Sequence, residues 1–342
     1  MRNIAQLTAM ATSVTLLIGC GGGDQTSAAE STGINAISAL QVGAVSAQIS
    51  PTRLGQVTTL VGGAESENPN PIGLATDNSG NLYVTQWRDD DPDANNHVVS
   101  NYYDTVRRID TNNQESTFTA GFSAPVGLAI DKNSSLYVAS TDDTVVYKIP
   151  LSTKIKSPLV EIPDATPNAI YFDGNTGALY VADFFGSLYI ISGGVTQTIT
   201  FPNNSRPQGI ALDSHGNILV TDYNLNKIWK ITKSGSNFLV SSLSISLNGQ
   251  ATLNQPYGII TDKNDNIFVA DQGNHVIRKI APTGNISTFA GVIGAPGTAD
   301  GDGSSARFNL PSGLAIDSLG YLYVSDYGSH KVRKVLVSAP LN

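Results

Sequence analysis

Residues 256–280 read PYGIITDKNDNIFVADQGNHVIRKI, and this stretch decides the fold. Two short apolar runs, 256–261 and 267–271, flank a polar turn, as in a β-hairpin. A third run at 275–280 alternates apolar and basic residues, which predicts a strand with one buried and one solvated face. A fourth run at 286–290 predicts the outer strand. The stretch therefore predicts one four-stranded antiparallel sheet, with strands a to d.

The same unit occurs six times along the chain. Each copy opens with Pro-x-Gly or a close variant, reaches an Asp, and then carries a run of the type Leu-Tyr-Val-Ala-Asp. The copies begin at Pro71, Pro125, Pro167, Pro207, Pro256 and Pro311. Neighbouring copies start 40–55 residues apart, which is typical of propeller blades with loops of variable length. The sequence therefore predicts an all-β fold, a six-bladed β-propeller of four-stranded blades.

The last copy lacks a fourth strand of its own. After Val335-Leu336-Val337 the sequence continues for only five residues. By contrast, Gln56 to Gly62 has the pattern of strand d and precedes the first copy without strands a to c. Pairing this segment with the last copy removes an exposed strand edge. We therefore predict a propeller over residues 55–337, closed by its N-terminal strand, and a tail at 338–342.

Residues 287–313, STFAGVIGAPGTADGDGSSARFNLPSG, and the other five copies resemble the NHL repeat family. Its units run Pro-x-Gly-Ile/Leu-Ala-x-Asp, Gly-x-Leu-Tyr-Val-Ala-Asp and Asn-x-x-Ile-Arg-Lys-Ile. The resemblance covers about residues 55 to 337 and implies a six-bladed propeller. Related propellers include lactonases and lyases with a metal at the pore, and peptide-amidating lyases. Their functional residues are not carried over, because no motif beyond the repeat matches, and one fold hosts many activities.

Composition and charge narrow the class of protein. The 342-residue chain is 40% hydrophobic and 14% charged, with 33 glycines, which is typical of a turn-rich globular protein. Its net charge of −8 would repel a phosphate backbone, whereas nucleic-acid binding relies on a basic surface. We therefore expect no nucleic-acid partner. We also expect a monomer.

The first twenty residues resemble the signal of a bacterial lipoprotein. Arg2 precedes an apolar run from Ala9 to Ile18, which is too short to span a bilayer as a helix. The run leads into Leu17-Ile18-Gly19-Cys20, which is similar to a lipobox. Cys20 is the only cysteine and so has no intramolecular disulfide partner. We expect a signal peptide at 1–19 and a lipid, palmitate included, on Cys20; a secretory signal with a coincidental cysteine stays open.

The segment that follows Cys20 predicts a tether. Residues 20–54 are rich in Gly, Ser, Ala and Gln and carry little charge. Such a flexible chain would put about 30 Å between anchor and domain. Gly21 does not resemble the Asp that commonly retains such proteins at an inner membrane. We expect an extracytoplasmic protein anchored to a bacterial membrane, the outer one if the host has two.

Three connections are longer than a blade requires: Trp87–Tyr103, Leu243–Gln255 and Val292–Leu310. In antiparallel blades the b–c and d–a connections lie on one face of the disc, so we expect all three on that face. Long loops on a rigid scaffold commonly carry binding residues. This face is the candidate binding surface, although drift in unconstrained loops also explains the lengths.

The first long connection carries most of the charged candidates. Beside Arg88 and His97 it holds four carboxylates within five residues: Asp89, Asp90, Asp91 and Asp93. Clustered oxygen ligands suit Ca²⁺. The spacing lacks the EF-hand pattern, and an exposed loop can also leave such charges solvated. We predict binding residues here, with no obligatory cofactor and with calcium as the candidate ion.

The residues that end strand b form a second candidate set, because they fall towards the same face. They are Gln86, Ser140, Asp183, Asp222, Asp271 and Asp326. We predict a partial acidic rim, and bonding to backbone amides of the b–c turn is the alternative. The Asp that ends strand a occurs in all six copies, which predicts a cap on the a–b turn.

No catalytic motif stands out in the sequence. His275 and His330 hold equivalent positions at the start of strand c, which indicates packing of the repeat. A Gly-x-Ser-x-Gly elbow, a phosphate-binding loop and His-Glu-x-x-His are absent. We predict a membrane-anchored module that binds or scaffolds a protein, peptide or glycan. The alternative is a metal-dependent hydrolase or lyase, lactonase-like or peptide-amidating-lyase-like, with its site at the pore mouth.

Overall fold

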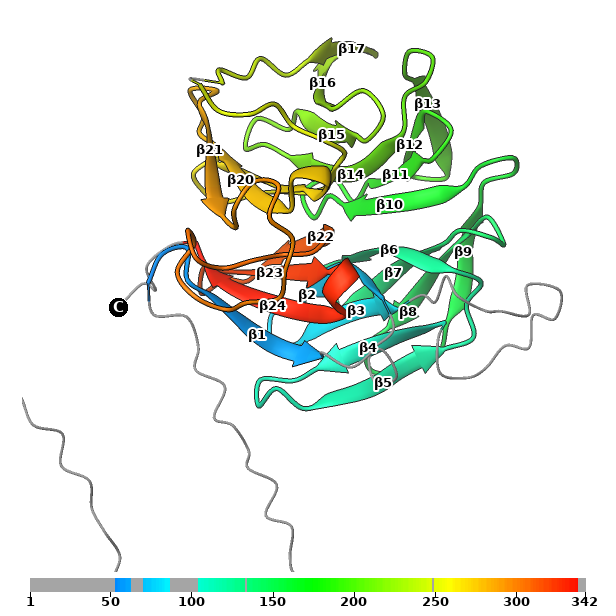
Figure 1. The fold of residues 1–342 in the computed structure, drawn as a ribbon. Coiled ribbons are helices and arrows are strands. Elements are labelled where there is room, and N and C mark those ends of the chain that lie inside the picture. The colour runs from blue at the N-terminus through cyan, green and yellow to red at the C-terminus, as the bar shows by residue number, and fades with distance from the viewer. Residues whose placement is uncertain (1–52, 63–69, 87–103, 133, 248, 338–342) are drawn as a thin grey trace, which may run out of the picture. The chain divides into compact units, whose positions relative to one another are not determined.

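A computed structural model describes residues 53–62, 70–86, 104–132, 134–247 and 249–337. Its contacts divide the chain into residues 1–46, which lie outside these ranges, and residues 47–342, which hold every described residue. The described residues form six four-stranded antiparallel sheets, each of them one blade (Figure 1). The predicted signal peptide, Cys20 and nearly all of the predicted tether lie outside the described residues.

Blades one to six are numbered in chain order, and each has strands a to d from the centre outward. The a strands are β2 (Pro71–Thr76), β6 (Pro125–Ile130), β10 (Pro167–Phe172), β14 (Pro207–Leu212), β18 (Pro256–Thr261) and β22 (Pro311–Ile316). The b strands are β3 (Leu82–Gln86), β7 (Ser135–Ser140), β11 (Leu179–Asp183), β15 (Ile218–Asp222), β19 (Ile267–Asp271) and β23 (Tyr321–Asp326). The c strands are β4 (Thr105–Ile109), β8 (Val145–Pro150), β12 (Ser187–Ser192), β16 (Lys227–Ser234), β20 (Val276–Ile280) and β24 (Lys331–Leu336). The d strands are β5 (Glu115–Ala120), β9 (Ser157–Glu161), β13 (Val195–Thr200), β17 (Asn237–Ser242), β21 (Ile286–Ala290) and β1 (Val57–Gly62).

The core lies between neighbouring blades. The a strands contact one another in a ring, in which β2 touches both β6 and β22. Six buried hydrophobic clusters among the described residues each combine side chains of two neighbouring blades. One cluster joins Leu74 and Val84 of blade one to Tyr323 and Val332 of blade six. The predicted six-bladed propeller is therefore confirmed.

The ring closes where the sequence predicted. β1 pairs antiparallel with β24, with Val57 opposite Val335 and Gly62 opposite Lys331 (Figure 1). Val57 is fully buried and Leu60 is nearly so, because both side chains enter the core. The N-terminal strand thus supplies strand d of blade six, which confirms the predicted closure.

Turn chemistry explains why the same hairpin forms six times. In every blade the Asp that ends strand a accepts a hydrogen bond from a backbone amide of the a–b turn. Asp317, for example, accepts from the amides of Leu319 and Tyr321. Each a strand begins with Pro, followed by a register shift against strand b, so the missing N–H leaves no gap in the ladder. The predicted cap is confirmed.

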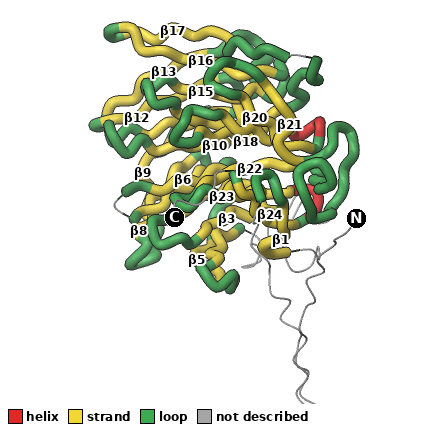
Figure 2. Tube along the Cα trace, turned by 90° about the vertical axis from the view of Figure 1, so that its left-hand side faces the viewer, coloured by secondary structure: helices red, strands yellow, loops and turns green. Residues whose placement is uncertain are grey.

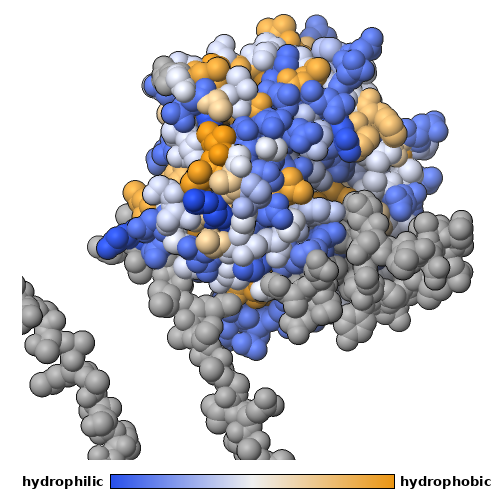
Figure 3. Space-filling view, viewed as in Figure 1, coloured by the Kyte–Doolittle hydropathy of each residue, from blue (hydrophilic) through white to orange (hydrophobic). Residues whose placement is uncertain are grey.

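Helical structure in the described ranges is confined to two short 3₁₀ turns. η1 (Gln272–Asn274) and η2 (Tyr327–Ser329) lie in the b–c turns of blades five and six, on the same side of the trace in Figure 2. Neither has the length or apolarity needed to span a bilayer. The surface seen in Figure 3 is mostly hydrophilic, with small separate hydrophobic patches.

Candidate functional site

The b–c turns and the starts of the a strands meet on one face, named here the loop-rich face. In blades two to four the residue after strand b donates its backbone N–H to a carbonyl just before strand a of the same blade, and in blades five and six the second residue after strand b does so. Phe184 donates to Thr166 and Tyr223 donates to Arg206. One predicted part of this face lies outside the described residues: Arg88, Asp89, Asp90, Asp91, Asp93 and His97.

The two long d–a connections do not stay on the loop-rich face, contrary to the prediction. Ser246 pairs with Asn285 at the start of β21, and Gly301 pairs with Val57 at the start of β1. Each connection therefore runs down the outer edge of the next blade and satisfies backbone groups of its strand d. An uncovered outer edge would be open to pairing with another chain. The extra length of these two connections therefore covers the outer strand edges of blades five and six.

A buried arginine anchors each of these connections. Arg278 donates to the carbonyl of Ala251, and Arg333 donates to the carbonyls of Ala299 and Arg307. The side chains of both arginines are fully buried, since the connections cover them. The predicted solvated face of strand c is therefore wrong at Arg278.

The same arginines face the acidic residues that end strand b. Arg333 lies 3.0 Å from Asp326, and Arg278 lies 3.9 Å from Asp271. Burial raises the pKa of Asp271 to about 6, although hydrogen bonds from Asn254 and Asn274 and the charge of Arg278 lower it. Burial likewise raises the pKa of Asp326.

The residues that end strand b are buried, and most of them bond to the segment that precedes strand a. Each of five accepts a hydrogen bond from a backbone amide 17 or 16 residues earlier, just before strand a of its own blade. Ser140 does so with the amide of Ser123, and Asp222 with that of Arg206. Gln86, also buried, contacts Glu115 instead. The residues of the set are at most 3% exposed, so they lie beneath the surface of the face: Gln86, Ser140, Asp183, Asp222, Asp271 and Asp326.

A narrow channel runs along the propeller axis. It is lined by the second residue of the Pro-x-Gly unit in five blades: Ile72, Val126, Asn168, Gln208 and Tyr257. Its volume is about 70 Å³, far below the roughly 300 Å³ of the smallest typical ligand pockets. Asn168 donates to the carbonyl of Pro207 and contacts the side chain of Gln208. A ligand larger than a few waters would therefore sit at the channel mouth, which is apolar at blades one and two and polar at blades three to five.

Blades three, four and five place a cationic and aromatic cluster at this mouth. Arg206 precedes β14, and its guanidinium carbon lies 3.6 Å from the centre of the Phe184 ring and 5.0 Å from that of Tyr223. Burial lowers the pKa of Arg206, and the nearby Tyr223 and Tyr257 offset this in part. We call Phe184, Arg206, Tyr223 and Tyr257 the Arg206 cluster.

Sequence reasoning missed this cluster because its members come from three blades. The signal it could have used is positional. Phe184 and Tyr223 both directly follow the last residue of strand b, and Arg206 directly precedes a Pro that opens strand a. In a propeller these two positions meet beside the channel, so aromatic and basic residues there are candidates for contact with a ligand.

The histidines have structural surroundings. His275 and His330 adopt left-handed backbone angles just before strand c, with φ of 59° and 55°. His275 Nδ1 accepts the backbone N–H of Leu310, 3.2 Å away, and so links blade five to the connection of blade six. Burial lowers the pKa of His275. His215 lies in the a–b turn of blade four, on the opposite face, as predicted.

Metal ligands do not gather within the described ranges, where no group of three His, Cys, Asp or Glu side chains could hold an ion. Asp300 accepts hydrogen bonds from Thr59 and from Arg333, which neutralises its charge. The calcium candidate rests on Asp89 to Asp93, which lie outside the described residues.

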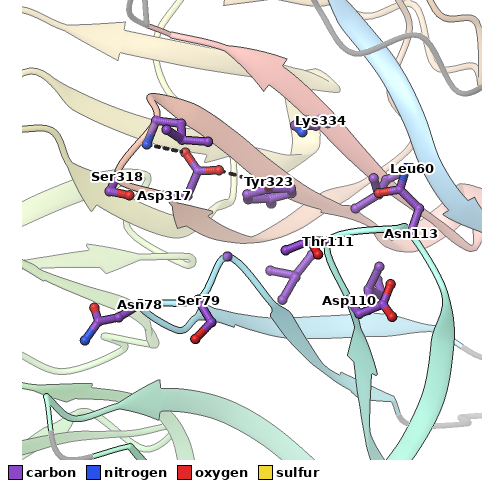
Figure 4. A pocket seen from close by; sticks show the side chains of 14 residues that line it. Leu60, Asn78, Ser79, Asp110, Thr111, Asn113, Asp317, Ser318, Tyr323 and Lys334 are labelled. Carbon is purple, nitrogen blue, oxygen red and sulfur yellow. Dashed lines mark hydrogen bonds between the residues drawn. The ribbon is translucent and has the colours of Figure 1, made fainter. Parts of the chain in front are cut away.

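The larger clefts lie on the opposite face. One of about 340 Å³ lies between blades six and one, and one of about 460 Å³ between blades four and five. Figure 4 shows the first, with Asp317, Tyr323 and Lys334 from blade six. Asp317 already accepts from turn amides and from the hydroxyl of Tyr323. Lys334 lies 4.0 Å from the centre of the Tyr321 ring. These clefts lie between turns of the repeat, and their lining includes residues whose hydrogen bonds stabilise those turns.

Comparison with known proteins gives two matches to a repeat and a likeness of fold. Residues 204–231 and 308–335 match the NHL repeat family. No curated protein sequence matches significantly. An auxiliary nutrient binding protein from Bacteroides thetaiotaomicron is similar in structure, with a TM-score of 0.65 and 17% identity over 82% of this chain and 75% of that one. Virginiamycin B lyase from Staphylococcus aureus is similar with a TM-score of 0.57 and 16% identity over 81% of this chain and 98% of that one. A gluconolactonase from Xanthomonas campestris is similar with a TM-score of 0.60 and 12% identity over 85% of this chain and 91% of that one. The chain is thus a six-bladed β-propeller, in which residues 204–231 and 308–335 match the NHL repeat.

Proposed function

We propose that this propeller is a membrane-anchored, extracytoplasmic binding module whose loop-rich face takes a glycan, peptide or protein. The observation that carries the proposal is the set of aromatic side chains that the b–c turns bring to the channel mouth. Phe184 and Phe185 follow β11, Tyr223 follows β15 and Tyr327 follows β23. Phe185 is 72% exposed, although a large apolar ring is costly to leave in water. Rings around a shallow mouth suit a ligand that lies on the face.

Two similar structures are in keeping with binding. They are auxiliary nutrient binding proteins from Bacteroides thetaiotaomicron and Bacteroides ovatus, of which the aligned region covers 75% and 78%. Lyases and lactonases with the same fold motivate the alternative, a metal-dependent enzyme at the same mouth. One fold supports both uses, so residues must decide between them.

Binding through the loop-rich face is tested with two matched variants of the purified full-length protein. Phe185→Glu places a charge on this face, and Leu319→Glu places one on the opposite face, where Leu319 is 61% exposed. Both are screened on arrays of oligosaccharides and peptides. We expect Phe185→Glu to lose the ligands of the wild type and Leu319→Glu to keep them. Loss in Leu319→Glu alone would assign binding to the other face.

The anchor and the enzymatic alternative have separate tests. Cys20→Ser is expected to move the protein from the membrane fraction to the soluble fraction, and retention in the membrane would refute the lipid. Metal analysis after dialysis addresses catalysis. Stoichiometric Ca²⁺ or Zn²⁺ would favour a hydrolase or lyase over a passive module.

A further inference from the structure

Arg206 differs from the other arginines of the described ranges in its hydrogen bonding. Arg107, Arg278 and Arg333 pair with carboxylates inside their blades. The remaining three bond to an amide oxygen, to backbone carbonyls or to a surface carboxylate: Arg108, Arg307 and Arg53. The Arg206 side chain makes no hydrogen bond or ion pair with any described residue. Its Nε is buried without an acceptor, as is the Nε of Arg278 and of Arg333, so Arg206 differs from these two at its terminal nitrogens.

The carboxylate that accepts the backbone N–H of Arg206, that of Asp222, cannot serve as the partner of its side chain. Asp222 accepts hydrogen bonds from Ser205, from the indole of Trp229 and from two backbone amides, including that of Arg206 itself. Both of its oxygens are occupied, and its side chain is fully buried. A half-buried cation without an acceptor is unfavourable, so the fold holds a site that an anion would stabilise.

The hydroxyls beside Arg206 are also unused. Tyr223 and Tyr257 donate to no described residue, whereas Tyr83, Tyr137 and Tyr323 each donate to an Asp of their own blade. The Arg206 cluster therefore presents one guanidinium and two phenol groups to the channel mouth, in a chain whose net charge is −8. This is a local site for an anion on an otherwise acidic protein.

The geometry selects the kind of anion. The guanidinium lies over the Phe184 ring, with its central carbon 3.6 Å from the ring centre, and the end of its planar fork can meet a carboxylate through two parallel bonds. The exposed ring of Phe185, 5.4 Å from that of Phe184, offers an apolar platform. The hydroxyls of Tyr223 and Tyr257 can hydrogen-bond to a ligand that is itself rich in hydroxyl groups. Resting on the proposed function, we infer that the Arg206 cluster is the subsite for the carboxylate of an acidic sugar in an oligosaccharide ligand.

The test is calorimetric titration of the full-length protein with trigalacturonate and with its methyl ester, which has the same rings without the charge. We expect the acid to bind and the ester to bind about 10- to 100-fold more weakly. Arg206→Gln should weaken binding of the acid by the same factor and leave binding of the ester unchanged. Arg206→Lys should restore little, because an ammonium lacks the planar fork. Lys132→Gln, which removes an exposed cation from an a–b turn on the opposite face, is the control.

Several outcomes would overturn the inference. One is equal binding of acid and ester by the wild type, and another is equal binding of the acid by Arg206→Gln and the wild type. The others are competition by inorganic phosphate as strong as that by the acid, and tighter binding of an acidic peptide than of the acid. Arg206→Gln loses the contacts of the guanidinium with the Phe184 and Tyr223 rings, which are worth about 0.5–2 kcal/mol, and so should lower the free energy of unfolding by no more than that. A larger loss would show a structural role instead. If neutral glycans or peptides bind and only Phe185→Glu abolishes this, the proposed function stands and the acidic subsite fails.

Discussion

At the residue scale, the glycine of the Pro-x-Gly unit lies where the a strands of neighbouring blades approach most closely. A Cβ added to Gly313 would lie 1.9 Å from the carbonyl oxygen of Ile72 in blade one. At Gly127 the nearest atom, a carbonyl oxygen of blade three, would be 2.9 Å away. Blade three itself carries Ala169 at this position. The joints of the ring therefore differ in how much room they leave.

Gly313→Ala should destabilise the propeller, because the added methyl forces blades six and one apart. Overpacking of this kind costs about 1–3 kcal/mol, and we expect the upper end here. Urea unfolding followed by far-UV circular dichroism measures the loss. Gly127→Ala is the matched control and should cost clearly less. Equal losses at the two sites would contradict the close-approach argument.

His275→Asn should change how stability depends on pH. Nδ1 must be unprotonated to accept the Leu310 amide, and burial lowers the pKa of His275 from its ordinary 6.5. As pH falls below 6.5 the unfolded chain takes up the proton first, so wild-type stability is complete above that pH and is lost below it. Asn226 makes the equivalent bond in blade four, to the Gln255 amide. The variant should keep the bond and lose the pH dependence, a difference of about 1 kcal/mol.

The measurement is chemical unfolding of both proteins at several pH values from about 7.5 to 5, where the unperturbed histidine titrates. The free energy of unfolding of the wild type, relative to that of the variant, should fall as pH falls. A constant difference would show that His275 does not titrate with folding.

At the scale of elements, the long d–a connections act as covers for the outer strands of blades five and six. Arg333 joins the cover to the blade, because it contacts both Asp326 in β23 and Asp300 in the connection. Asp300 in turn accepts from the backbone and side chain of Thr59 in β1. One buried cation therefore holds strand b, the connection and the closing strand together.

Arg333→Met should cost about 3 kcal/mol or more, because it leaves the buried Asp326 without its cation. Chemical unfolding measures the effect. Arg53→Met removes an exposed pair with Asp302, whose side chains are 78% and 61% exposed, and should cost well under about 1 kcal/mol. A similar cost for both variants would mean that burial does not matter to this pair.

The sequence predicted the repeat but not how its parts contact one another. Blade number and closure were predictable because Pro-x-Gly and the closing segment are local patterns that recur in order. The course of Leu243–Gln255 was not, because Ser246 follows the edge of a strand that comes 40 residues later. The Arg206 cluster was not, because stacking of Phe184 on Arg206 depends on the angle between blades three and four. The role of Ser140 and the strand-b acids is visible only as a repeated bond to an amide 16 or 17 residues back.

At the scale of the whole ring, β1 decides whether blade six has four strands. Deleting Gln56–Gly62 removes Val57 and Leu60 from the core and exposes the edge of β24. We expect the deletion variant to unfold at a lower temperature or to self-associate through that edge. Size-exclusion chromatography with light scattering and thermal unfolding test this. An equally long deletion at residues 24–30, in the predicted tether, should change neither, and a stable monomer without β1 would contradict the role of the closing strand.

The pairing of β1 with β24 also bears on how each new molecule is made. β1 leaves the ribosome before every other strand of the ring, and its partner is synthesised last. Blades one to five can each form from contiguous chain, whereas the final blade needs contacts between the two ends of the domain, and we expect these contacts to form more slowly. Any prematurely terminated chain leaves β1 unpaired and open to proteolysis. We therefore expect the ring to close only after β24 has been synthesised.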